Sequence, residues 1–151
     1  MKELRGTAGA SVDAPLERAL ALLEAVDGYP TWYPEVVKQV EVLERGADGP
    51  PQRVQAKLHF AQGPIARDFR LLLAVAVERP ELVRLTRIPH EPGDPERFEV
   101  TWRLARQTQT QTRIDLELRA DLDVPRFVPV ASIGDSLARG FVAAAVRQLT
   151  G

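Results

Sequence analysis

The chain has 151 residues, of which 44% are hydrophobic and 27% charged, and this ordinary globular composition excludes an intrinsically disordered chain. Twenty basic and 21 acidic residues give a formal net charge of -1, so no overall field attracts a polyanion and no nucleic-acid partner is expected. The absence of cysteine excludes disulfides, thiolate zinc sites and cysteine nucleophiles.

The first elements are an extended segment and a helix. Residues 3–12 are rich in small side chains and extended in character, and Asp13 with the nearby Pro15 offers an N-cap followed by proline, the usual opening of a helix. Apolar residues at helical spacing then predict a helix from about Leu16 that Gly28 and Pro30 end.

An aromatic and proline-rich stretch follows at residues 29–37. It holds three aromatic residues and two prolines, which predicts a turn and a second short helix that begins at Pro34. Within it, Trp32 and Tyr33 are candidates for a gate at the entrance of a pocket, with a simple packing cluster as the alternative.

Alternation of apolar and polar residues then takes over, which is the period of half-buried antiparallel strands. The alternating runs lie at residues 40–42, 54–60, 69–77, 83–85, 98–104 and 114–122. Their short connections predict a meander. From about Pro129 to Thr150 the apolar spacing returns to four residues and predicts a long amphipathic helix.

These elements predict a strongly curved sheet with the long helix laid across its concave face. One helix does not fill such a concavity, so we expect a mostly apolar cavity between helix and sheet. A chain of 151 residues is long enough for one core of this kind, and a single domain over residues 1–151 is expected.

The chain resembles the START-like (SRPBCC) superfamily in three features. They are the segment Trp32-Tyr33-Pro34-Glu35-Val36, the strand Val40-Glu41-Val42-Leu43-Glu44 that follows it, and the Pro125 to Pro129 approach to the last helix. Within it the chain is similar to the branch of polyketide cyclase/dehydrase and coenzyme Q-binding proteins. The resemblance covers nearly the whole chain. It implies an α+β helix-grip fold: a curved antiparallel sheet of about seven strands around a long C-terminal helix, with two short helices between the first two strands.

The resemblance also implies a function. A hydrophobic small molecule, such as a lipid, an isoprenoid quinone or an aromatic polyketide, is expected between the sheet and the long helix. Our first hypothesis is a lipid-binding type of carrier or sequestering protein without chemistry of its own. The alternative is an enzyme of the polyketide cyclase, aromatase or dehydratase kind that uses the same cavity, with Arg87, Arg67, Tyr33 or Tyr29 assisting. A module that docks on a protein is a third hypothesis with little support from the near-neutral charge.

No catalytic residue, metal ligand set or cofactor is assigned. The sequence has no Gly-x-Ser-x-Gly elbow and no nucleotide fingerprint, and its two histidines, His59 and His90, lie far apart without a ligand motif. His59 is predicted on the outer face of the sheet, and His90 lies in a proline-rich loop.

The candidate ligand-binding residues follow from strand parity and helix spacing. Trp102 shares the inward parity of Val100, which makes it either a core aromatic or a pocket wall. Arg87 shares the parity of Leu85, so its guanidinium is predicted either to enter the cavity and bind an anionic or quinone oxygen or to reach solvent at the strand end. The full set of expected ligand-binding residues is Trp32, Tyr33, Phe60, Phe69, Leu71, Leu85, Arg87, Phe98, Trp102, Leu137 and Phe141.

Two expectations concern the surroundings of the protein. Leu72, Ala74 and Ala76 are apolar on the face assigned to solvent, which indicates either an oligomer contact, such as a homodimer interface, or a covering element; no protein partner is identified. The N-terminus lacks the apolar region of a signal peptide and no run of roughly 18 apolar residues occurs, so a cytoplasmic protein without stable membrane insertion is expected.

Overall fold

A computed structural model describes residues 2–62, 65–122 and 130–151. Over these residues seven strands form one antiparallel sheet in the order β1-β7-β6-β5-β4-β3-β2. The strands are β1 (Lys2–Val12), β2 (Val37–Arg45), β3 (Pro51–Gln62), β4 (Ile65–Glu78), β5 (Leu82–Arg87), β6 (Arg97–Arg106) and β7 (Thr112–Leu122). The meander runs from β2 to β7, and the first strand then pairs with the last, so the two ends of the chain meet in one half of the sheet.

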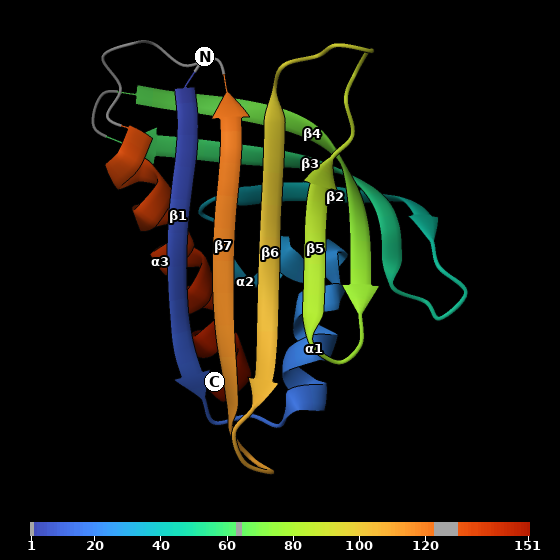
Figure 1. The fold of residues 1–151 in the computed structure, drawn as a ribbon, viewed down its shortest axis with the longest axis vertical. Helices are drawn as coiled ribbons and strands as arrows, with labels where there is room; N and C mark the ends of the chain where they lie inside the picture. The colour runs from blue at the N-terminus through green and yellow to red at the C-terminus, as the bar shows by residue number, and fades with distance from the viewer. Residues whose placement is uncertain (1, 63–64, 123–129) are drawn as a thin grey trace.

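The helices gather on one face of this sheet (Figure 1). They are α1 (Leu16–Glu24), the three-residue 3₁₀ helix η1 (Val26–Gly28), α2 (Tyr29–Trp32) and α3 (Val130–Thr150). The strongly bent strands β2, β3 and β4 cross behind the others, and the concave side encloses the helices. The predicted α+β helix-grip fold is therefore confirmed, with α3 as the long C-terminal helix. The predicted Pro125 to Pro129 approach to it lies outside the described residues.

Two details of the predicted helices are wrong. The short second helix does not begin at Pro34: α2 covers Tyr29–Trp32, and the residues after it form a turn into β2. Pro30 does not end the first helix but lies in the first turn of α2, where the missing N–H of proline costs nothing.

The cap of α1 also differs from the prediction. Asp13 does not cap the helix, because its Oδ1 accepts a hydrogen bond from Nε2 of Gln111 at 2.9 Å. Pro15 occupies the cap position instead, and its carbonyl accepts the N–H groups of Arg18 and Ala19 at 3.1 Å. The start of α1 is thereby tied to the loop that precedes β7.

The core lies between the concave face of the sheet and the helices. Alternate residues of β6 and β7 point inward, as period-two strands require, and are buried: Phe98, Val100, Trp102, Leu104, Ile114, Leu116, Leu118 and Ala120. The buried face of α3 is built largely from small residues, including Ala138, Ala144 and Ala145, and packs mainly against β1. Because α3 lies toward the β1 side, the remaining concavity is covered by α1, η1 and α2.

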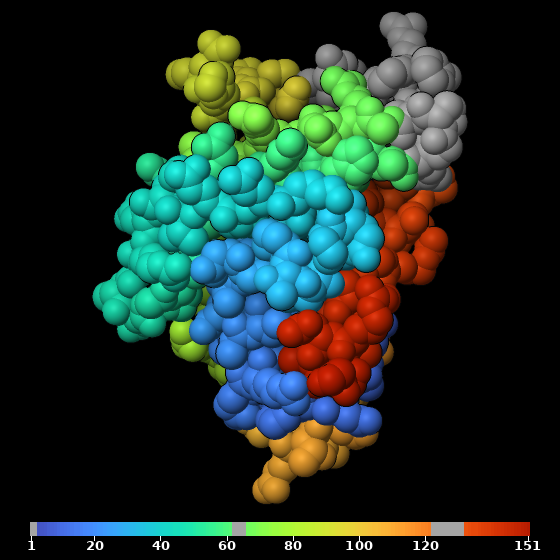
Figure 2. Space-filling model, turned by 180° about the vertical axis from the view of Figure 1, so that it is seen from behind, coloured from blue at the N-terminus to red at the C-terminus, as the bar shows by residue number. Residues whose placement is uncertain are grey.

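The space-filling view from behind shows this cover: α1, α2 and the first part of β2 lie together against α3 (Figure 2). No helix of the described residues is long and apolar enough to cross a membrane.

Candidate ligand pocket

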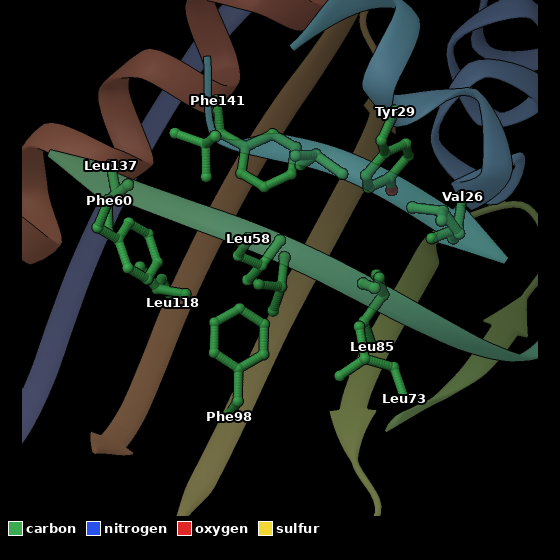
Figure 3. Close-up of a pocket in the computed structure, with 15 residues that line it drawn as sticks. Val26, Tyr29, Leu58, Phe60, Leu73, Leu85, Phe98, Leu118, Leu137 and Phe141 are labelled. Carbon is green, nitrogen blue, oxygen red and sulfur yellow. The ribbon is translucent and has the colours of Figure 1, made fainter. Parts of the chain in front are cut away.

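A small apolar cavity of about 40 Å³ lies inside the concavity, between α3, α2, the strands β2 and β3 and the inner face of the sheet. Fifteen residues line it (Figure 3). They are Val26, Tyr29, Val36, Val37, Val40, Ala56, Leu58, Phe60, Leu73, Leu85, Phe98, Val100, Leu118, Leu137 and Phe141. Residues far apart in the sequence thus form one wall around a hydrocarbon space.

Most of the lining residues are inward-facing members of the alternating strands. Ala56, Leu58 and Phe60 are successive inward residues of β3, and Phe98 and Val100 are successive inward residues of β6. Figure 3 shows Phe60 next to Leu137 at one end of the cavity and Tyr29 next to Val26 at the other. The cavity therefore runs from the N-terminal half of α3 toward η1.

Tyr29 is the one lining side chain with a polar atom, and that atom is already engaged. Its hydroxyl donates a hydrogen bond to the carbonyl of Leu23 at 2.6 Å. Burial raises the pKa of Tyr29 far above its ordinary value, and the neighbouring Trp102 indole only partly offsets this rise. The phenol is therefore neutral at physiological pH and is held toward the backbone.

The half-buried lining residues mark the side on which the cavity approaches the surface. Ten of the lining residues are buried, whereas Val36, Val40, Phe60, Leu137 and Phe141 are only partly buried. These five come from the turn into β2 and its start, the end of β3 and the middle of α3. The mouth of the cavity thus lies between α3 and the β2–β3 side of the sheet.

Phe141 is the centre of an aromatic cluster at the inner end of this mouth. Its ring centroid lies 5.5 Å from that of Tyr29, 5.7 Å from Trp32, 4.8 Å from Tyr33 and 5.4 Å from Trp102. Tilted and edge-on arrangements at these distances are the favourable ones for aromatic pairs. Phe141 therefore forms part of the cavity wall and separates the cavity from the two indoles.

Arg87 lies outside this cavity. Its Nη2 contacts Asp94 Oδ2 at 2.8 Å and its Nη1 donates to the carbonyl of Glu96 at 2.9 Å. The guanidinium and the N–H of Glu96 together hold the pKa of Asp94 at about 2, below its ordinary value. This pair fixes the loop between β5 and β6, beside a second, polar cavity of about 350 Å³ that Arg87, Asp94 and Phe98 help to line.

The comparisons with known proteins agree with this architecture. The family model described as "Polyketide cyclase / dehydrase and lipid transport" matches residues 12–146. The chain belongs to this family. No curated protein sequence matches the chain significantly.

Solved structures with the same fold have low sequence identity to this family member. A START superfamily protein from Mycobacterium smegmatis superposes with a TM-score of 0.80 at 17% identity, with 97% of each chain covered. An aromatase/cyclase from a Streptomyces species gives 0.58 at 18% identity, with 99% of this chain and 87% of that chain covered. A major latex-like protein from Panax ginseng gives 0.67 at 6% identity, with 99% of each chain covered. These likenesses show the START-like fold.

Of the eleven ligand-binding residues predicted for this polyketide cyclase/dehydrase family member, five line the cavity: Phe60, Leu85, Phe98, Leu137 and Phe141. The structure places the others around it. Trp32, Tyr33 and Trp102 lie behind or beside Phe141 in the aromatic cluster. Ligand binding by any of the eleven stays a prediction.

The remaining predicted residues pack against side chains outside the cavity. Phe69 packs on Phe60 with ring centroids 5.3 Å apart, and Leu71 is buried in the core. The guanidinium of Arg67, a candidate helper of catalysis, lies 5.6 Å from the centre of the Phe69 ring on an exposed part of β4.

Burial also raises the pKa of one more candidate, Tyr33, to about 12. The nearby Glu35 adds to this rise and Arg147 opposes it. His59 lies on the outer face as predicted, with its Nδ1 2.6 Å from Oδ1 of Asp68. Neither side chain reaches the cavity.

Several lining residues are missing from the predicted ligand-binding set. Ala56 and Leu58 share the inward parity of Phe60, so a signal for them existed in the alternation of β3. Val26 falls at the helical spacing of the first predicted helix, and Tyr29 was expected only as a helper in the enzyme alternative. Val36 carried no signal, because it lies in a turn where no period applies. Among the described residues no group of three or more His, Asp or Glu side chains could hold a metal ion.

Proposed function

We propose that this protein binds an apolar small molecule in the cavity beneath α3 and acts as a carrier or sequestering protein. The observation that carries the proposal is the lining itself. Every lining side chain except Tyr29 is a hydrocarbon, and the Tyr29 hydroxyl is hydrogen-bonded to Leu23. Burial of apolar ligand surface, worth about 25 cal/mol per Å², is then the main favourable interaction on offer.

The size of the cavity sets a condition on binding. At about 40 Å³ it is much smaller than the roughly 150 Å³ of a protein cavity that admits benzene. A ligand must therefore widen it, and the half-buried Phe60, Leu137 and Phe141 at the mouth are the side chains with room to move. Lipid, isoprenoid quinone and aromatic polyketide, the ligand types implied by the resemblance, all present the apolar surface that such a widened pocket would accept.

The alternative function, a cyclase or aromatase, is supported by the family description and by the name of the Streptomyces structure. A cyclase needs groups that exchange protons with the bound chain. In the cavity only Tyr29 has such a group, and burial keeps its proton in place. Arg87 is engaged by Asp94 at the opposite side of Phe98, so the lining favours binding over chemistry.

The test combines the identity of a natural ligand with a blocked cavity. Native mass spectrometry of the purified protein should reveal a bound apolar molecule that is released on denaturation. The fluorescent probe N-phenylnaphthylamine should bind the wild type, and Ala56→Leu, which adds bulk to the buried lining, should weaken binding at least about tenfold. Ala61→Leu on the exposed end of the same strand is the matched control and should bind like the wild type.

Equal probe binding by Ala56→Leu and the wild type would contradict the proposed location of the site. The carrier and the enzyme are distinguished by whether the bound molecule is chemically changed. A carrier returns the apolar molecule with its mass unchanged, whereas recovery of a dehydrated or cyclised product would establish the enzyme.

A further inference from the structure

Two buried hydrogen-bond donors lie close to the apolar cavity. The indole Nε1 atoms of Trp32 and Trp102 are both buried, and neither makes a hydrogen bond to any of the described residues. A buried N–H without an acceptor is costly, and such groups in native proteins call for a specific explanation. The explanation differs for the two indoles.

Trp102 has a nearby polar group. Its indole and the Tyr29 ring both pack on Phe141, and the indole lowers the pKa of the Tyr29 phenol against the dominant effect of burial, so the Tyr29 oxygen is its nearby acceptor. The Tyr29 proton is committed to the Leu23 carbonyl, which leaves the lone pairs of that oxygen available to an N–H from the other side. Trp102 thus has an acceptor within its own surroundings.

For the Trp32 indole no acceptor is found among the residues that the structure describes. Its ring packs against Tyr29, with centroids 4.8 Å apart, and against Phe141, with centroids 5.7 Å apart. Both of these rings line the cavity and Trp32 does not, so Trp32 lies one aromatic layer behind the cavity wall. Phe141 is partly buried and lies at the mouth, and the cavity must widen there before it holds a ligand. A shift of the Phe141 ring would join the Trp32 indole to the ligand space.

We infer that the Trp32 indole N–H is the hydrogen-bond donor of the pocket, and that the ligand is a neutral apolar molecule with an acceptor oxygen, such as a ketone or ester carbonyl. This inference rests on the proposed binding function and specifies its ligand. A carbonyl fits because it accepts without bringing a donor of its own. A hydroxyl would carry a proton into a lining whose single polar side-chain atom, the Tyr29 oxygen, is already hydrogen-bonded to Leu23. A charged group would lose its hydration without gaining a partner.

The experiment uses two nearly isosteric probes, acetophenone and α-methylstyrene, which differ in a carbonyl oxygen against a methylene group. Because the chain has two tryptophans, a proton–nitrogen correlation spectrum shows two indole signals, and Trp32→Phe assigns them. Acetophenone should move the Trp32 indole proton strongly downfield, and α-methylstyrene should not. The Trp102 signal, from the indole near the Tyr29 oxygen, is the internal control and should move little with either probe.

Affinities from the same titrations give a second measure that does not depend on assignment. Acetophenone should bind the wild type about threefold to tenfold more tightly than α-methylstyrene, the range expected for one net hydrogen bond. In Trp32→Phe this preference should fall to near one, while the affinity for α-methylstyrene stays within about twofold. The hydrocarbon probe thus also reports whether the variant keeps its fold and its pocket.

The outcomes separate this inference from the function on which it rests. If both probes bind equally well and the Trp32 signal responds alike to both, the pocket exists and the hydrogen-bonding role of Trp32 is refuted. If neither probe binds the wild type, the proposed binding function is refuted, and so is the inference that the ligand is a neutral apolar molecule with an acceptor oxygen.

Discussion

Gly6 of β1 and Gly134 of α3 cross with their backbones in direct contact. A Cβ atom added to Gly134 would overlap the carbonyl of Arg5, and one added to Gly6 would overlap the carbonyl of Gly134. The obstacles are backbone atoms, which do not move aside as a flexible side chain does. The absence of both side chains is what lets the N-terminal half of α3, which contributes Leu137 and Phe141 to the cavity, lie against the first strand.

Gly134→Ala should therefore lower the free energy of unfolding by about 1–3 kcal/mol, the usual cost of overpacking. Alanine is the better helix former by about 1 kcal/mol, so a net loss would show that crowding against β1 dominates. Gly28→Ala is the control, because an added Cβ there meets no atom within 4 Å and its backbone angles, φ -87° and ψ -11°, suit alanine. Urea unfolding measures both, and equal stabilities would contradict the close crossing.

The ion pair of Arg87 and Asp94 predicts a dependence of stability on pH. The pKa of Asp94 in the folded protein is about 2, whereas an unfolded aspartate titrates near roughly 3.9. A depressed folded-state pKa stabilises the protein above the unfolded value, and this contribution is lost as the pH falls through about 4 toward 2. Asp94→Asn should be less stable than the wild type at pH 7, and the difference should shrink over this acidic range.

Urea midpoints at pH 7, 4 and 2 measure this effect. Asp48→Asn in the exposed turn between β2 and β3 is the control and should follow the wild type at every pH. A gap between Asp94→Asn and the wild type that stays constant with pH would mean that the carboxylate charge plays no part.

The period-two alternation in the sequence was sufficient to predict the strands of the sheet and the direction of their side chains. The alternating runs that contain Phe60, Leu85 and Phe98 predicted inward side chains, and the structure has them facing the cavity. Inward parity alone does not identify a cavity wall, however. Val100 and Trp102 share one face of β6, yet Val100 borders empty space while the space at Trp102 is filled by Phe141 from α3. That difference depends on packing across the molecule.

The features that the sequence did not predict lie where no period applies. Pro30 and Pro34 are equally good residues for the first turn of a helix, so the position of α2 depended on the packing of Tyr29 and Trp32 against Phe141. Arg87 has inward parity, but its guanidinium is drawn to Asp94, seven residues further on in an irregular loop. The destination of that side chain depends on a loop conformation that alternation does not specify.

Thr112 links the start of β7 to the turn before α1. Its hydroxyl is fully buried and donates to the carbonyl of Ala14 at 2.8 Å, across 98 residues of chain. Thr112→Val keeps the shape of the side chain and leaves that carbonyl without its donor, so the free energy of unfolding should fall by about 1 kcal/mol. Thr7→Val at an exposed position of β1 is the matched control and should stay within about 0.5 kcal/mol of the wild type. A loss no larger than that of the control would show that the buried bond adds nothing.

Phe141 joins the aromatic cluster to the cavity, and its truncation should affect stability and access together. Phe141→Ala removes contacts with four other rings and should cost about 3 kcal/mol, near the lower end for phenylalanine because the side chain is only partly buried. It also widens the mouth between α3 and the β2–β3 side, so N-phenylnaphthylamine should associate faster than with the wild type in a stopped-flow measurement. Leu43→Ala, at a leucine that is 48% exposed, should change neither quantity appreciably. A Phe141→Ala variant that is destabilised but takes up the probe at the wild-type rate would place the route to the cavity elsewhere, because the ring would then be a packing residue and no part of the gate.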